Sequence, residues 1–276
     1  MAKKKANVDD IWANVPKDVE GHYLEAATDE SGYVIASEKI SNITSHPIKA
    51  GNKIGIRETV QLPLKGSYQL FASGPPGSKM TISLERVFGS GGHNHGAPTA
   101  GSFAVGTIFP DEIVFGGGWP QNVRTVYSAW DVSGAVRLIG RCSAPPYVIE
   151  HRMEIMIQGL QPIQTTLDLK LKPPTTIHPS PYWGAPSFIS KLVQLSNLYA
   201  ATTGKSITIT DASLEWGGRF DLQSDWMYPH HEHMDGHQAD IRSNDMTMAE
   251  SEIFLKIAEQ IGLDVIVESD HWHVRG

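Results

Sequence analysis

One cysteine, Cys142, stands in the whole chain of 276 residues. An intramolecular disulfide needs two cysteines and the common structural zinc clusters need several, so neither can form within this chain. A metal site in this protein must therefore use histidine, aspartate or glutamate as its ligands.

Long apolar runs and an excess of basic residues are also absent. No stretch approaches the roughly 18 consecutive apolar residues of a membrane-spanning helix, so we expect no membrane span. The net charge of −7 argues against a nucleic-acid partner bound through its phosphates. No apolar run of signal-peptide type follows Lys5. A chain whose leader had been replaced by an engineered start would lack such a run as well.

The length exceeds the usual size of a single domain, so we expect two domains. Residues 1–52 are interpreted as an N-terminal extension. Across residues 53–170, short runs of β-branched and aromatic residues alternate with clusters of Gly, Pro, Asn and Ser, which predicts a β-sandwich-like domain of unknown role. The clearest expected strands are Ile54 to Leu62, Tyr68 to Ala72, Met80 to Val87, Val123 to Trp130 and Val148 to Ile157.

A proline-rich segment that begins at Leu171 marks the expected boundary, which we place between residues 165 and 180. Beyond it, apolar residues at helical spacing predict a helix over residues 188–199 that stops at Gly204. A strand is expected over residues 206–210.

A second helix is marked by the capping-box pattern of Thr247 and Glu250, and Gly262 suits its C-terminal end. A strand over residues 263–268 follows, and its end delivers His271 and His273. Residues 171–276 therefore predict an α+β domain.

Histidines are concentrated in this second half. Six of the twelve lie between residues 230 and 273, where an even distribution would place about two. The segment 229–240 is too polar for a core, and Gly236 supplies a turn that lets flanking side chains converge. Imidazole and carboxylate are ordinary zinc ligands, so the cluster together with Asp240 predicts a metal site. The six are His230, His231, His233, His237, His271 and His273.

His271 and His273 stand two residues apart on an expected strand and therefore share one face of it. One of them can bind a metal ion while the other acts on a substrate. The alternative for an H-x-H pattern alone is a pair of exposed surface histidines.

A separate pair lies in His93-Asn94-His95, within the glycine-rich stretch 89–101. We interpret this stretch as a mobile hairpin tip, and a second metal or ligand loop is the alternative.

The pattern His233-x-x-Gly236-x-x-x-Asp240, followed by His271-x-His273, resembles the signature of the LAS metallopeptidases. That group contains lysostaphin-type enzymes, D-Ala-D-Ala peptidases and penicillin-insensitive murein endopeptidases, and the last are the most similar. The further matches are the segment Gly217-Gly218-Arg219-Phe220, the extra histidine His230 three residues before the first ligand, and the C-terminal His271-Trp272-His273-Val274-Arg275.

The resemblance covers residues 178–276 and implies an α+β LAS-type zinc peptidase domain. It implies that His233, Asp240 and His273 bind Zn²⁺ and that His271 is the catalytic residue beside the metal. Related D-Ala-D-Ala peptidases use an acidic residue three positions before the last ligand, a spacing that Asp270 also has, so the general base is His271 or Asp270. Arg219 would bind a substrate carboxylate or assist the oxyanion, or else form a surface salt bridge.

Two departures from the family fall around the expected cleft. A longer, aromatic-containing insert separates Phe220 from His230, and Glu268 stands where the endopeptidases have a further histidine. Peptide-bond chemistry is therefore better supported than the identity of the bond.

The implied activity is metal-assisted hydrolysis of peptide bonds in peptidoglycan cross-links or stem peptides, of the murein endopeptidase or D,D-carboxypeptidase type, in the periplasm or outside the cell. One alternative is a non-catalytic, zinc-stabilised binding module that recognises a cell-wall polymer or a protein partner. Its site would be closed by His230, His231 or His237 as a fourth ligand. A second alternative is hydrolysis of another amide or an ester.

Overall fold

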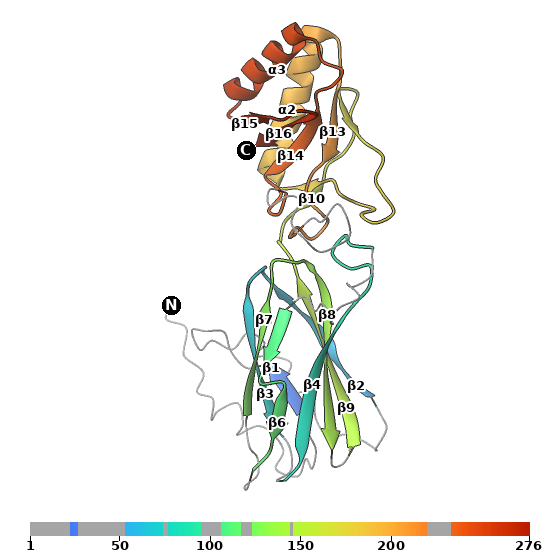
Figure 1. Cartoon of the computed structure of the whole chain (residues 1–276), viewed down its shortest axis with the longest axis vertical. Helices are drawn as coiled ribbons and strands as arrows, with labels where there is room; N and C mark the ends of the chain where they lie inside the picture. The colour runs from blue at the N-terminus through green and yellow to red at the C-terminus, as the bar shows by residue number, and fades with distance from the viewer. Residues whose placement is uncertain are drawn as a thin grey trace. The chain divides into compact units, whose positions relative to one another are not determined.

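A computed structural model describes residues 23–26, 53–73, 77–94, 106–116, 123–143, 146–219 and 233–276. This part of the chain is rich in strands, which form several sheets, and contains two helices (Figure 1). Neither of these two helices is both long enough and apolar enough to cross a membrane. The chain divides into two compact units: unit 1 comprises Met1–Val87, Ser102–Trp130 and Ala135–Glu154, and unit 2 comprises Phe88–Gly101, Asp131–Gly134 and Ile155–Gly276.

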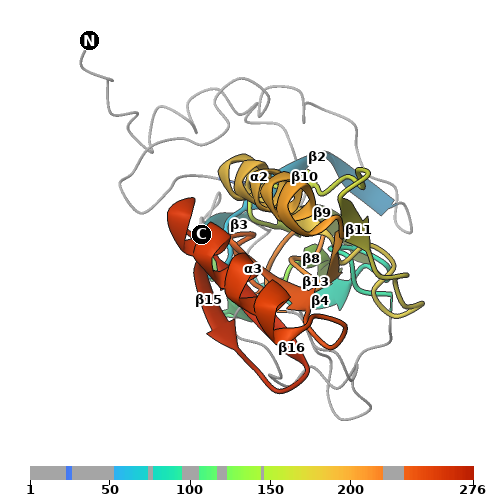
Figure 2. The same cartoon turned by 90° about the horizontal axis from the view of Figure 1, so that it is seen from above.

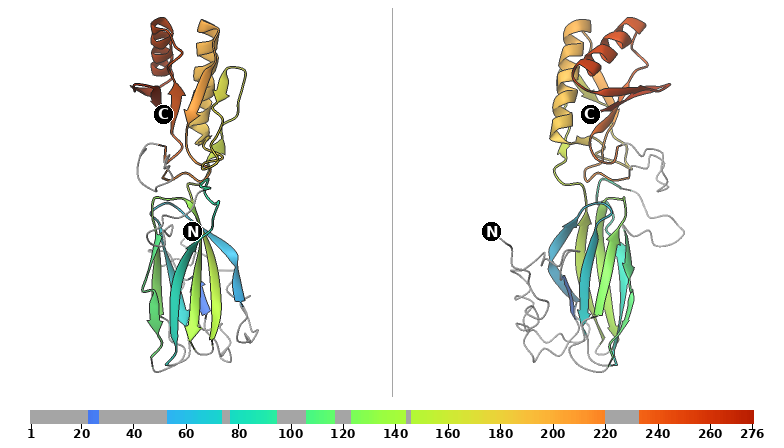
Figure 3. Two further views of the ribbon diagram at one scale, coloured as in Figure 1. Left: turned by 45° about the vertical axis from the view of Figure 1, so that its right-hand side comes forward. Right: turned by 90° about the vertical axis from the view of Figure 1, so that its left-hand side faces the viewer.

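The described strands of unit 1 form two sheets, which Figure 3 shows from two further directions. The strands of the first sheet, in spatial order, are β1 (Tyr23–Ala26), β3 (Ser67–Ser73), β7 (Val123–Ala129) and β5 (Gly106–Phe109). Those of the second are β2 (Lys53–Leu62), β9 (Pro146–Ile155), β8 (Gly134–Ser143), β4 (Lys79–Arg86) and β6 (Glu112–Val114).

The two sheets of unit 1 share a buried layer. Tyr68 on β3 stacks on His151 of β9 with ring centroids 6.0 Å apart, and both side chains are buried. The five strands expected from runs of β-branched and aromatic residues are confirmed, each within two residues of the expected ends. Strand β8 was not expected, because buried residues such as Leu138 and Ile139 follow one another directly and hide the two-residue period.

Unit 2 contains a five-stranded sheet that carries the candidate site. Its spatial order is β11 (Leu169–Leu171), β13 (Ile207–Asp211), β14 (Gln238–Arg242), β16 (His271–Arg275) and β15 (Asp264–Val267). The β11–β13 pair is parallel and the other pairs are antiparallel. A separate two-stranded sheet joins β10 (Gln161–Pro162) to β12 (Trp183–Gly184).

Both helices expected in unit 2 are confirmed, and α2 begins two residues earlier than expected. Helix α2 (Pro186–Thr203) has proline in its first turn and ends at Gly204, whose φ of 74° is left-handed. Helix α3 (Met248–Gln260) starts with the expected capping box, in which the Thr247 hydroxyl and the Glu250 carboxylate each accept the other residue's backbone N–H. Figure 2 shows the two helices side by side.

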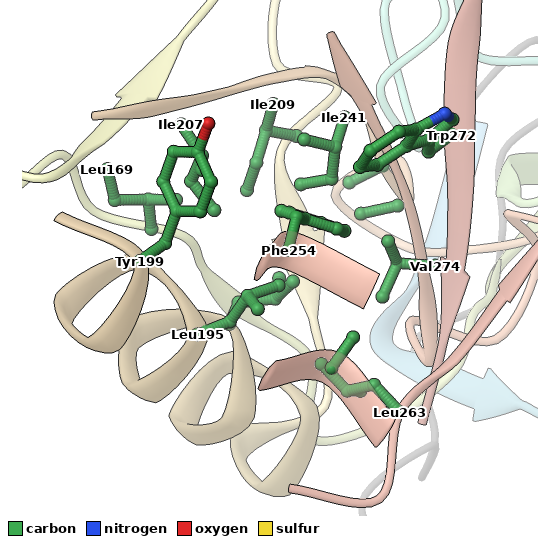
Figure 4. Packing of buried hydrophobic residues seen from close by; sticks show 14 of the residues in the cluster. Leu169, Leu195, Tyr199, Ile207, Ile209, Ile241, Phe254, Leu263, Trp272 and Val274 are labelled. Carbon is green, nitrogen blue, oxygen red and sulfur yellow. The ribbon is translucent and has the colours of Figure 1, made fainter. Parts of the chain in front are cut away.

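The apolar face of the sheet packs against α2 and α3 (Figure 4). Phe254 of α3 lies at the centre of this packing, with its ring centroid 4.7 Å from that of Trp272 and 5.9 Å from that of Tyr199. Leu169 and Ile163 belong to the same cluster. Residues that precede the proline-rich segment therefore pack within unit 2. The division at Ile155 therefore lies before the boundary expected at residues 165–180.

We predict that Thr247→Ala lowers the free energy of unfolding of unit 2 by about 1 kcal/mol, because it removes the side-chain cap at the start of α3. Urea denaturation followed by helical circular dichroism measures this, since both described helices belong to unit 2. Thr202→Ala is the control: its exposed hydroxyl bonds within the last turn of α2, so a much smaller change is expected. Equal losses in the two variants would contradict the capping account.

Candidate metal centre

The sheet of unit 2 has a polar face opposite its apolar core. Successive side chains on a strand point to opposite faces. On β14, Ala239 and Ile241 join the helix-packed cluster, which leaves Asp240 on the other face. On β16, Trp272 and Val274 do the same, which leaves His273 there.

The strand register aligns the polar residues in a row. Asp240 of β14 is paired directly with His273 of β16, and on its other side with Asp211 of β13. A register irregularity between Ile209 and Asp211 precedes this last pair, as expected of a bulge that re-aims a side chain beside a site. The row therefore runs Asp211, Asp240, His273 across three strands.

Three buried donors converge on this face. His233, Asp240 and His273 each offer a ligand atom, and the three atoms lie within 4.8 Å of one another. Asp240 is the centre: its Oδ1 lies 2.8 Å from His273 Nδ1 and its Oδ2 lies 3.3 Å from His233 Nε2. The two imidazole rings meet edge to face with centroids 5.1 Å apart. The structure thus brings together the three residues whose sequence pattern predicted a metal site.

Asp240 is held as a carboxylate. Burial raises the pKa of its carboxyl, but hydrogen bonds from His233 and His273 outweigh burial and hold the pKa below the usual range. A buried anion flanked by two imidazoles is a suitable binding position for a cation.

His271 lies on the same face, beside the three donors but outside them. Its Nε2 is 3.5 Å from Asp240 Oδ2 and 3.4 Å from Glu268 Oε2, and its Nδ1 is 2.8 Å from Asp270 Oδ1. Its side chain keeps 18% of its surface exposed, whereas His233 and His273 are buried. Burial lowers the pKa of His271, while Asp240, Asp270 and Glu268 raise it, and the net direction is upward.

Asp211 is a site residue that the sequence did not reveal. It is half-buried in the row, and burial together with the charge of Asp240 raises the pKa of its carboxyl, against an opposing effect of Lys172. The only signal in the sequence was an aspartate at the end of an apolar strand, and its proximity to the histidines depends on a pairing with β14 that was not expected.

The loop that carries His233 is positioned by two glycines. Gly236 has a φ of 80°, and a Cβ there would overlap Leu160 and approach Ala185 N to 3.0 Å. Gly217 has a φ of 69°, and a Cβ there would lie 2.7 Å from Met234 O. The turn expected at Gly236 is therefore confirmed, and the backbone next to His233 leaves no room for side chains at either glycine.

Arg219 lies in the segment that packs against the loop carrying His233. Its Nη2 is 2.7 Å from Asp131 Oδ1, its backbone N–H donates to Asp131 O, and both side chains are largely buried. The adjoining Gly218 N–H donates to Met234 O at 2.8 Å. Of the roles predicted for Arg219, this geometry favours an ion pair, although one that is mostly buried rather than on the surface.

The other histidines of the two predicted clusters differ in their placement. His93 is buried and its ring contacts His178 edge to face at 5.3 Å, so the interpretation of this residue as a mobile hairpin tip was wrong. His237 is exposed, 3.6 Å from Asp235, and lies outside the three-donor group. His95, His230 and His231 lie outside the described residues, as does the insert after Phe220.

The three-donor group fits a divalent metal ion. In a tetrahedral site with bonds of about 2.0–2.1 Å, neighbouring ligand atoms lie about 3.3 Å apart. His233 Nε2 lies 3.3 Å from Asp240 Oδ2, and the three ligand atoms all lie within 4.8 Å of one another. Two imidazoles and one carboxylate suit zinc and also other first-row ions such as Fe(II).

Segment 229–240 was expected to be too polar for a core, but its last two residues, Ala239 and Asp240, are buried on strand β14. Asp240 can be buried because its polar partners enclose it.

Comparisons with known proteins add little to this geometry. No protein-family model matches the sequence, and neither does any curated protein. Among solved structures, the class 5 fimbriae chaperone CfaA matches with a TM-score of 0.27 and 7% identity, over 35% of this chain and 52% of the chaperone chain. The match thus spans about half of the chaperone, and a likeness of this size carries no argument about fold or function.

We predict about one divalent ion per chain in the purified protein, and a sharp drop in His233→Ala, Asp240→Ala and His273→Ala, because each removes one of three converging ligands. Elemental analysis after gel filtration measures the content. His237→Ala is the matched control, since this nearby histidine is exposed and outside the group. Full retention of metal in all three ligand variants would overturn the assignment.

Proposed function

We propose that this protein is a zinc-dependent peptidase of the LAS type that hydrolyses peptide bonds in bacterial peptidoglycan. The observation that carries the proposal is the placement of a partly exposed imidazole, His271, within 3.5 Å of the carboxylate that binds two buried histidines. A purely structural metal site has no need of such a group, whereas hydrolysis needs a base next to the metal.

His233, Asp240 and His273 would hold the ion, through His233 Nε2 and His273 Nδ1 on the histidines. When bound, zinc supplies Lewis acidity that activates water and polarises a carbonyl group. The protein's contribution is rigidity: two ligands come from the paired strands β14 and β16, and the third from the loop fixed at Gly236. Ligands held in this way cost little reorganisation during a reaction.

His271 is the base in this proposal, and Asp270 is its positioning residue. The Asp270 carboxylate accepts the Nδ1–H of His271, which leaves Nε2, the nitrogen that faces Asp240 and Glu268, to take up or release a proton. The Asp270 carboxylate is largely exposed and lies 2.8 Å from the outer nitrogen of this ring, so of the two bases that the sequence allows, the geometry favours His271. A cation held by Asp240 would offset the negative charge that raises the pKa of His271, and this favours the neutral imidazole that a base requires.

The substrate class follows from the resemblance between His233-x-x-Gly236-x-x-x-Asp240 with His271-x-His273 and the murein endopeptidases. Cross-links and stem peptides of peptidoglycan are the proposed substrates, and the periplasm or the cell exterior is the proposed location. Glu268 and Asp270 are exposed beside His271 and add negative charge at the point where a substrate would approach.

We predict that His271→Ala retains the metal and loses about 100-fold to 10,000-fold in turnover, the usual contribution of a positioned general base. Mass spectrometry of digested cross-linked peptidoglycan measures turnover, and elemental analysis measures the metal. Asp270→Asn keeps the shape of the side chain but removes the charge of the oxygen that accepts the His271 Nδ1–H. This variant should lose less activity than His271→Ala.

Two results would count against this function. Loss of the metal in His271→Ala would make His271 a ligand rather than a base. A zinc-loaded wild type that cleaves no peptidoglycan peptide between about pH 6 and 9 would favour a binding module, whatever the variants show.

A further inference from the structure

We propose that Gln238 is a positioning residue that directs His273 to bind the metal through Nδ1. The inference rests on the metal site of the proposed function, and it does not depend on which bond the enzyme cuts. It concerns a side chain that the metal-ligand pattern does not include.

The strand register places Gln238 beside His273. Gln238 stands two residues before Asp240 on β14, and therefore on the same polar face of the sheet. Asp240 is paired with His273, so Gln238 reaches the ring diagonally from its own pairing with Arg275. Its Oε1 lies 3.2 Å from His273 Nε2, while Asp240 Oδ1 lies 2.8 Å from Nδ1. One strand thus contacts both nitrogens of the same imidazole.

The amide oxygen of Gln238 determines which nitrogen of His273 carries the hydrogen. Oε1 only accepts hydrogen bonds, so the Nε2 that faces it carries the hydrogen. When a cation displaces the proton that Nδ1 shares with Asp240, the imidazole that remains is neutral, with its hydrogen on Nε2 and its lone pair on Nδ1, the nitrogen that faces the metal position. Partners of this kind on metal-binding histidines fix the ring and its tautomer, and their loss costs about 10-fold to 100-fold in metal affinity.

His271 provides an internal comparison two residues away. Its Nδ1 contacts Asp270 and its Nε2 faces Asp240, the reverse of the arrangement at His273. The two histidines of the His271-x-His273 pair therefore present opposite nitrogens to the centre. Gln238 and Asp270 are the outer partners that distinguish the ligand from the base.

The orientation of the Gln238 amide decides the inference. If its NH₂ group faced the ring, it would donate to Nε2 and place the lone pair on the wrong nitrogen. Glutamate offers oxygens only, so Gln238→Glu keeps the acceptor and removes this ambiguity. Gln238→Leu keeps comparable bulk and removes the acceptor.

The experiment measures zinc affinity of the full-length protein by competition with a chromophoric chelator. Gln238→Leu should bind zinc about 10-fold to 100-fold more weakly, and Gln238→Glu should bind as tightly as the wild type or more tightly. Arg242→Gln is the matched control, because Arg242 lies two residues after Asp240 on the same face, is exposed, and pairs with His271 rather than His273. Its zinc affinity should stay unchanged.

A second readout does not require a variant to fold. In the zinc-loaded wild type, nitrogen-15 NMR should show His273 protonated at Nε2 with slow solvent exchange. Wild-type affinity in Gln238→Leu, equal losses in Gln238→Glu and Gln238→Leu, or a proton on His273 Nδ1 would each overturn the inference.

The outcomes separate this inference from the proposed function. Unchanged zinc affinity in Gln238→Leu with peptidoglycan still cleaved by the wild type would refute the role of Gln238 alone. Weakened affinity in Gln238→Leu with no cleavage by the wild type would support Gln238 and refute the peptidase. A wild type that binds no metal would refute both.

Discussion

The antiparallel register between β14 and β16 is the constraint on which the site depends. Because side chains alternate along a strand, burying Ile241 and Trp272 against the helices forces Asp240 and His273 to the opposite face, directly across from each other. A slip of one residue would exchange the two faces and place apolar residues at the site. The hydrophobic core of unit 2 therefore fixes the geometry of its polar centre.

The polar centre in turn requires partners for its buried charge. A buried carboxylate such as Asp240 is costly unless charged or hydrogen-bonding partners surround it, and His233 and His273 supply them. A bound cation would complete the neutralisation and would join β14, β16 and the His233 loop. Metal binding would then stabilise the folded state of unit 2, since the unfolded chain does not hold these ligands together.

Local patterns in the sequence predicted much of this fold. Capping by Thr247 and Glu250 and termination at Gly204 depend on neighbouring residues alone, so both were predicted correctly. Runs of β-branched and aromatic residues likewise identified five strands of unit 1. Strand β8 was missed because it is buried on both faces, and β14 was missed because its centre is an aspartate that is buried only through its partners.

The donors of the site were predictable, but their surroundings were not. His233, Asp240 and His273 were expected as ligands from the resemblance of their motif to the LAS metallopeptidases, and a motif is visible in the sequence alone. The contacts of Asp211 with Asp240, of Gln238 with His273 and of Arg219 with Asp131 join separate segments of the sequence that only the tertiary fold brings together. The burial of His93 against His178 is of the same kind, because the contact joins residues more than eighty positions apart.

Zinc K-edge X-ray absorption of the metal-loaded wild type and of His271→Ala tests the central claim, that two imidazoles and one carboxylate form the centre with His271 beside it. Two imidazoles in the first coordination shell of both proteins, with oxygen as the remaining donors, is the predicted result. A third imidazole in the wild type that disappears in His271→Ala would contradict the account, because His271 would then be a ligand and not the base.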